Sequence, residues 1–410
     1  MIGDVSRPLG LTARLAERYW PQLLLLGAFG YIAHDLLLEA AVAAGLRNAL
    51  AGMVILSLVV LVKLAVIVAM FSVLRPALPG ITGLGGGPGA PPESEPKADG
   101  RLLAVTAAAI LPFFVYYAAW GFLGDTVREY SREALARTPF GERASFLDLA
   151  QSRWVFFSIA GIWMIRWLAK GMNDRAKVPY WRFLVVACDA SWVFIGLYAL
   201  TTFKDQLIEY FGSGRFMTGD KVSWFALVSP ASAAADFTPV ELIEPSFWLQ
   251  AQNLFFFALL PLVWLVMAAI INGYEVSTKP ARRDHAATSH WRKWVGDFIG
   301  HFIAGYRSRY TPVWKCVRLT LGASIATLLT FVIAYQAITW LGAWAWVGAT
   351  RLIGAHDLAT WQFLADPIAL FIGSPSDLDG GIVLDVLRIC LLAAVLDHAL
   401  GSGSSYSSRR

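Results

Sequence analysis

Four times along the sequence a long apolar segment leads into a polar or amphipathic stretch and is followed by a second apolar segment. In the first three repeats the first segment ends on the same phrase, Asp-x-x-x-Glu. The phrase occurs as Asp35/Glu39, Asp125/Glu129 and Asp205/Glu209. Because about 20 apolar residues in a helix cross the hydrocarbon core of a bilayer, the pattern predicts paired membrane crossings and an internal repeat.

Composition agrees with this interpretation, since only 15% of the 410 residues are charged, against about 25% in soluble domains. The outward segments cover residues 20–41, 103–124, 182–203 and 314–340, and the returning segments cover 51–74, 153–172, 250–272 and 381–400. Backbone polar groups in lipid must be satisfied within the segment, which helices achieve. We therefore expect an all-α polytopic membrane protein, with about eight transmembrane helices as four tandem hairpins and amphipathic surface helices on both faces.

The spacing of these segments divides the chain into hairpins and connecting regions. A Gly/Pro-rich stretch at 79–100 has the composition of a flexible linker. The predicted divisions are 1–78 (N-terminal amphipathic segment and hairpin 1), 79–100 (cytoplasmic linker), 101–180 (hairpin 2), 181–275 (hairpin 3 with a long external segment), 276–312 (cytoplasmic loop with a basic amphipathic helix), 313–401 (hairpin 4 with an external amphipathic segment) and 402–410 (disordered tail).

The basic residues indicate the orientation of the chain. Basic runs follow two of the returning segments, RWLAKGMNDRAK and STKPARRDHAATSHWRKW. Such runs favour the cytoplasmic side, so we expect both termini in the cytoplasm. The Ala/Gly/Arg-rich composition suggests the inner membrane of a bacterium. Since the sequence has no groove-reading motif, the net charge of +5 reflects topology and we expect no nucleic-acid partner.

One cytoplasmic stretch, residues 291–306, has large apolar residues at the i, i+3, i+4, i+7 spacing of a single helical face. They are Trp291, Trp294, Phe298, Phe302 and Tyr306. With basic residues on its flanks, such a helix either lies in the headgroup plane or docks a partner protein. The pattern does not separate these two hypotheses.

The three Asp-x-x-x-Glu phrases place two carboxylates on one helical face, about 5–6 Å apart. If the three helices extend outward together, the acids would line a common vestibule suited to a cation, because hard cations take oxygen ligands. The plainer interpretation is that polar residues return wherever a helix leaves lipid. The sequence does not decide between these two interpretations, and a cation remains a possible ligand of the acids.

Charged residues also occur within the predicted spans. Lys63 and Asp189 lie at comparable depth, where an unpaired charge costs at least about 3 kcal/mol. We expect them to form an ion pair, which either locks two helices together or carries protons in a coupled transporter. Asp385 and Arg388 lie one turn apart in the last span and are expected to satisfy each other or to make an interhelical contact.

The sequence offers no catalytic or metal-binding motif. No G-x-S-x-G elbow is present, and the three cysteines have no metal-ligand spacing. His34-Asp35 and His356-Asp357 are adjacent pairs, which point about 100° apart on a helix and chelate poorly. We expect no cofactor and do not expect an enzyme.

Our first hypothesis is therefore a non-catalytic integral membrane subunit or scaffold that packs with partner proteins in a membrane complex, in contact with membrane lipids. The alternative is a cation- or proton-coupled small-solute transporter that uses the acidic vestibule and the Lys63/Asp189 pair. Heavily apolar, tryptophan-rich helices favour the first hypothesis. The scarcity of Gly- or Pro-broken spans disfavours the second.

Overall fold

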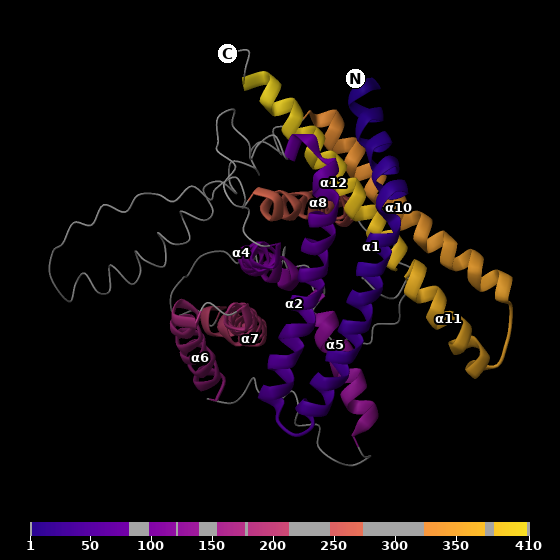
Figure 1. The fold of residues 1–410 in the computed structure, drawn as a ribbon. Coiled ribbons are helices and arrows are strands. Elements are labelled where there is room, and N and C mark those ends of the chain that lie inside the picture. The colour runs from indigo at the N-terminus through magenta and orange to yellow at the C-terminus, as the bar shows by residue number, and fades with distance from the viewer. Residues whose placement is uncertain are drawn as a thin grey trace, which may run out of the picture. The chain divides into compact units, whose positions relative to one another are not determined.

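The computed structural model describes residues 2–81, 98–119, 122–138, 154–176, 179–212, 247–273, 324–373 and 381–407. Within these ranges the chain is almost entirely helical and contains no strand. The elements are α1 (Ile2–Gly45), α2 (Ala49–Leu74), η1 (Arg75–Ala77), α4 (Ala98–Ala119), α5 (Phe122–Arg137), α6 (Trp154–Ala176), α7 (Pro179–Gly212), α8 (Phe247–Gly273), α10 (Ile325–Ile353), α11 (Leu358–Ile372) and α12 (Ile382–Ser407) (Figure 1).

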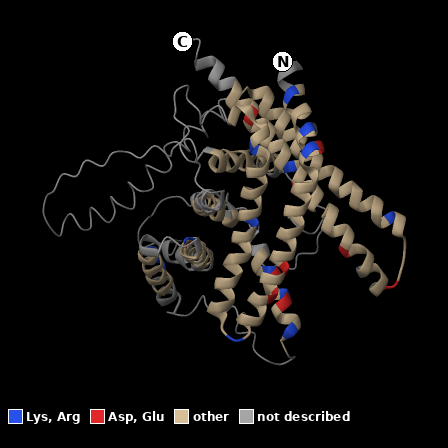
Figure 2. Cartoon of the chain, viewed as in Figure 1, with Lys and Arg blue, Asp and Glu red and all other residues tan. Residues whose placement is uncertain are grey.

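Four of the described helices are long and apolar enough to cross a bilayer. They are Ser6–Gly45, Ala49–Ala77, Tyr180–Tyr198 and Ile325–Ile353. Figure 2 shows long uncharged stretches along α1, α2 and α10. The chain is thus an all-helical membrane protein with four candidate spans in its described part. Each of the other four predicted ranges overlaps a helix (α4, α6, α8 and α12), and the total of eight crossings stays a prediction.

The chain divides into two compact units. Unit 1 comprises Met1–Gly30, Ala65–Ala109 and Ala258–Arg410, and unit 2 comprises Tyr31–Leu64 and Ile110–Phe257. Each unit is described by its own contacts.

Helix α1 has two distinct faces. In unit 1, Leu23 is fully buried, and Gly27 and Gly30 lie so close to Ile382 and Val66 that a Cβ at either glycine would overlap them. Small residues let neighbouring backbones approach in this way in membrane helices. On the opposite face, Leu25, Phe29, Ile32 and Leu36 are all more than half exposed. These four residues, spaced i, i+4, i+7 and i+11, are called the α1 stripe.

In unit 2, a short turn connects α1 to α2. The side chain of Asn48 accepts hydrogen bonds from the backbone N–H groups of Leu50 and Ala51 at 2.9 and 3.3 Å and so caps the start of α2. Next to this turn the Tyr130 ring of α5 inserts against two glycines. A Cβ at Gly45 would overlap its hydroxyl, and a Cβ at Gly52 would lie 2.6 Å from it. Burial of the Tyr130 side chain raises the pKa of its phenol.

In unit 1, α10, α11 and α12 pack against one another (Figure 1). Helix α10 runs to Ile353, past the predicted end of the seventh span at residue 340, and α11 occupies part of the predicted external segment 341–380. Gly354, with φ of 77°, ends α10, and Asp357 caps α11 by accepting hydrogen bonds from the Thr360 N–H at 3.2 Å and hydroxyl at 2.6 Å. Gly381 lies against the backbone of Ile372 and Gly373, which leaves no room for a side chain.

Candidate functional site

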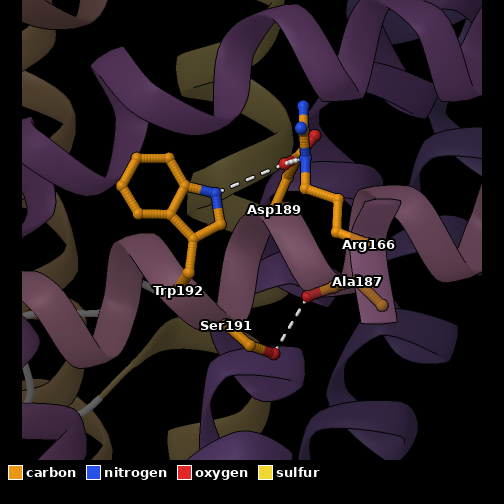
Figure 3. Close-up of polar contacts among 5 residues, drawn as sticks. All are labelled: Arg166, Ala187, Asp189, Ser191 and Trp192. Carbon is orange, nitrogen blue, oxygen red and sulfur yellow. Dashed lines mark hydrogen bonds and ion pairs between the residues drawn. The ribbon is translucent and has the colours of Figure 1, made fainter. Parts of the chain in front are cut away.

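A polar site in the described part of unit 2 is centred on Asp189 of α7. Its carboxylate pairs with the Arg166 guanidinium of α6 and accepts a hydrogen bond from the Trp192 indole N–H at 3.3 Å (Figure 3). The Arg166 and Asp189 side chains are 34% and 23% exposed. Trp192 lies one turn after Asp189, so both point to the same side of α7.

This arrangement corrects the predicted Lys63–Asp189 pair. Ser191, two residues after Asp189, lies 2.8 Å from the Ser57 hydroxyl of α2 and so faces that helix. Residues two apart on a helix point about 200° apart, so Asp189 faces away from α2, which carries Lys63. In the described part of the chain the ion pair of Asp189 is therefore with Arg166, and the predicted partner was wrong.

Lys63 has a different neighbour. Its ammonium nitrogen lies 3.4 Å from the Tyr117 hydroxyl of α4, toward which it can donate a hydrogen bond. The Tyr117 ring stacks on Phe113 with 5.3 Å between centroids. The contact places a hydroxyl dipole beside the lysine within an aromatic cluster.

A second charged site lies between α10 and α12 of unit 1. Arg388 forms the predicted contact with Asp385, with 3.0 Å between Nη1 and Oδ1. It also crosses to α10, where Nη2 donates to the Thr339 hydroxyl at 3.2 Å and the guanidinium lies 5.5 Å from the centre of the Tyr335 ring. Arg388 is thus held both by its own helix and by a cation–π and hydrogen-bonding surface on the neighbouring helix.

The glutamates of the first two Asp-x-x-x-Glu phrases have basic neighbours. Glu39 lies 3.5 Å from Arg137 and Glu129 lies 3.9 Å from His34, all within the contact between α1 and α5. The side chains of Asp125, Asp205 and Glu209 lie outside the described residues, as does the whole predicted helix at 291–306 with Trp291, Trp294, Phe298, Phe302 and Tyr306. A three-sided acidic vestibule therefore stays a prediction, and the described residues contain no group of three or more His, Cys, Asp or Glu able to hold a metal.

Asp397 of α12 makes a contact that sequence reasoning missed. Its carboxylate accepts hydrogen bonds from the backbone N–H groups of Gly80 and Ile81 at 2.6 and 3.2 Å. Asp397 is 7% exposed, and a Cβ at Gly80 would lie 2.9 Å from the same oxygen. Residues 79–81, the start of the predicted linker, are therefore helical and held against α12, whereas residues 82–97 lie outside the described part.

Sequence reasoning also missed Arg166, Tyr335 and Thr339. Arg166 was assigned to the cytoplasmic basic run RWLAKGMNDRAK, although it lies in the middle of α6 between apolar residues, and that position was a usable signal. No sequence signal marked Tyr335 and Thr339, because only the packing of α10 on α12 brings them to Arg388.

Chemically, the two charged sites neutralise themselves. Each joins one arginine to one aspartate and adds an aromatic side chain, an arrangement that stabilises helix contacts and offers no nucleophile paired with a base. The described cysteines, Cys188 and Cys390, are buried and free. Comparison with protein-family models, curated proteins and solved structures finds no match for this chain.

Proposed function

We propose that this protein is a non-catalytic integral membrane subunit that packs through its helices with a partner protein. The observation that carries the proposal is the α1 stripe, since only 11% of the apolar window of α1 is buried. On the same exposed side of this helix, Arg18 and Asp35 are separated by about 26 Å of helix at 1.5 Å per residue. This length approaches the thickness of the hydrocarbon core, which supports a position of Leu25, Phe29 and Ile32 among the acyl chains, with Leu36 at the edge beside Asp35.

The spacing of the stripe supports a helix partner. Leu25, Phe29, Ile32 and Leu36 alternate steps of four and three residues, which is the spacing of a seam between two helices. Within the described residues, Asp189 pairs with Arg166 and Asp385 pairs with Arg388, so these four charges compensate one another and do not by themselves suggest a path for an ion. Together these features favour lateral association over chemistry or transport.

The proposed topology keeps the predicted eight crossings, with both termini in the cytoplasm and the protein in the inner membrane of a bacterium. The basic residues Arg7, Arg14 and Arg18 precede the stripe on the exposed side of α1, which supports a cytoplasmic N-terminus. The predicted helix at 291–306 would add a second contact, with lipid headgroups or with the partner.

A photo-crosslinking amino acid placed at Phe29 tests the proposal in intact membranes. We expect a discrete protein adduct from Phe29 and only lipid adducts from the matched position Leu329 on α10, which is also exposed and apolar. The adducted partner should co-purify in constant ratio in mild detergent. If Phe29 yields lipid adducts alone and the chain purifies without a companion, the proposal is wrong.

The alternative function is coupled transport of a cation or proton, and the observation in its favour is that Asp189 remains 23% exposed beside Arg166. A transporter reconstituted alone should take up solute and lose uptake in Asp189→Asn while keeping its fold. A structural subunit should show no uptake in either form.

A further inference from the structure

The exposed side of α10 is apolar along nearly its whole length. Ile325, Leu329, Ile333, Leu341 and Leu352, spaced mostly by multiples of four residues, are all more than half exposed, and Leu352 is 90% exposed. Arg351, in the last turn, is the first charged residue of this helix. At 100° per residue these side chains wrap around about half of the helix, so the exposed apolar surface of α10 stays uncharged from Ile325 to its last turn.

Helix α10 is longer than a bilayer crossing requires. Its 29 residues extend about 44 Å at 1.5 Å per residue, against a hydrocarbon thickness of about 30 Å. Trp340 and Trp344, whose ring centroids are 5.8 Å apart, are both exposed. Trp344 lies about 28 Å along the axis from Ile325, which is where an interfacial tryptophan is expected. The last turns of α10 continue past this level.

Helix α11 packs against α10 and α12 and turns its other face outward. Phe363 and Phe371, 78% and 52% exposed, lie on this face together with Pro367. At 100° per residue, Asp366 falls at the border of the face, about 60° from Phe363. Of the other charged and titratable residues here, Arg351 is in the last turn of α10, and His356 and Asp357 lie between the two helices.

We propose that α11 and the last turns of α10 form an apolar hairpin that lies in the boundary between acyl chains and headgroups of the bilayer. Phe363, Phe371 and Leu352 contact the acyl chains, and Asp366 points toward the headgroups. Lipid is the occupant because the exposed face of α10 is continuous with its candidate span, and because the polar residues are confined to the border and the turn, as in interfacial helices. The proposal rests on the membrane location of α10 and not on a partner protein.

The test uses the full chain in phosphatidylcholine vesicles, with Cys188, Cys316 and Cys390 replaced by alanine and a single cysteine carrying an NBD fluorophore. The labelled variants are Phe363→Cys, its matched neighbour Asp366→Cys, and Leu329→Cys in the candidate span. Quenching by brominated acyl chains is compared with quenching by aqueous iodide. We expect acyl-chain quenching at position 363 to exceed iodide quenching at least threefold, and the order to reverse at position 366.

Two results would overturn the hairpin proposal. Iodide quenching at 363 equal to that at 366 would place α11 in water, and protection of 363 from both quenchers would mean that protein covers it, in the form of a second copy. The label at position 329 distinguishes a wrong hairpin proposal from a wrong assignment of α10 to the membrane. Iodide quenching at 329 would show that α10 does not cross the bilayer at all. Lipid quenching at 329 combined with either negative result at 363 rejects the hairpin alone.

Discussion

Arg166 of α6 and Asp189 of α7 form an ion pair across the contact between these two helices, and Trp192 donates a further hydrogen bond to the same carboxylate. The Asp189 carboxylate thus accepts from two donors, Arg166 and Trp192, and the Arg166 guanidinium has a counter-charge among apolar helices. Removing either partner alone leaves the other charge without compensation, which costs more than removing both.

We therefore predict that Arg166→Leu destabilises the protein by about 3 kcal/mol, at the low end for a buried pair because both side chains keep some exposure. Arg166→Leu/Asp189→Leu should recover most of this loss. Thermal unfolding in detergent measures both. Lys63→Leu is the control, because it removes the predicted partner of Asp189 and should not be rescued by Asp189→Leu.

The Tyr130 contact with Gly45 gives a second prediction. Gly45→Ala places a Cβ against the Tyr130 hydroxyl and should cost about 1–3 kcal/mol through overpacking. Gly196→Ala on α7 is the matched control, because nothing lies within 4 Å of a Cβ there. A Gly45→Ala protein as stable as the Gly196→Ala protein would contradict the tight fit.

Asp397→Ala should leave the Gly80 and Ile81 amides without their acceptor. We expect a loss of about 1–3 kcal/mol, because an unsatisfied buried polar group costs that much. Hydrogen exchange at these two amides should accelerate, whereas Asp397→Asn, which keeps a carbonyl acceptor, should change exchange less. Unchanged exchange in Asp397→Ala would show that the contact does not hold this segment.

The cap of α11 should depend on pH. The hydrogen bonds from Thr360 lower the pKa of Asp357 from its ordinary value of 3.8. A lowered pKa in the folded state stabilises the helix above the ordinary value, and this stabilisation is lost as the pH falls through the lowered pKa. Protection of the Thr360 amide, measured relative to its intrinsic exchange rate at each pH, should therefore fall below pH 3.8 in the native protein, and Asp357→Asn should remove this pH dependence of the protection.

The positions of the apolar helices could be predicted from the sequence, because length and hydropathy are local properties. The predicted spans at 20–41, 51–74 and 182–203 coincide with parts of α1, α2 and α7. The contact between Asp385 and Arg388 was also predictable, since one helical turn brings them together. Helix ends were less predictable, because α10 continues past residue 340 through ten more uncharged residues and Arg351, and nothing local ends it before Gly354.

The partner of Asp189 could not be predicted, because it depends on which side of α7 faces α2. That choice is visible only in the Ser57–Ser191 contact, between residues far apart in the sequence. The hydrogen bonds of Asp397 are a similar case. Its partners are backbone N–H groups, which every residue except proline carries, so no residue type marks them.

The hydrogen bonds from Gly80 and Ile81 to Asp397 join parts of the chain that are more than three hundred positions apart. A truncation that removes Asp397 would thus disturb the segment at Gly80 and Ile81 as well as the C-terminal helix. Deletion experiments at the C-terminus should be designed to keep α12 through this aspartate, and a tag is better attached after it.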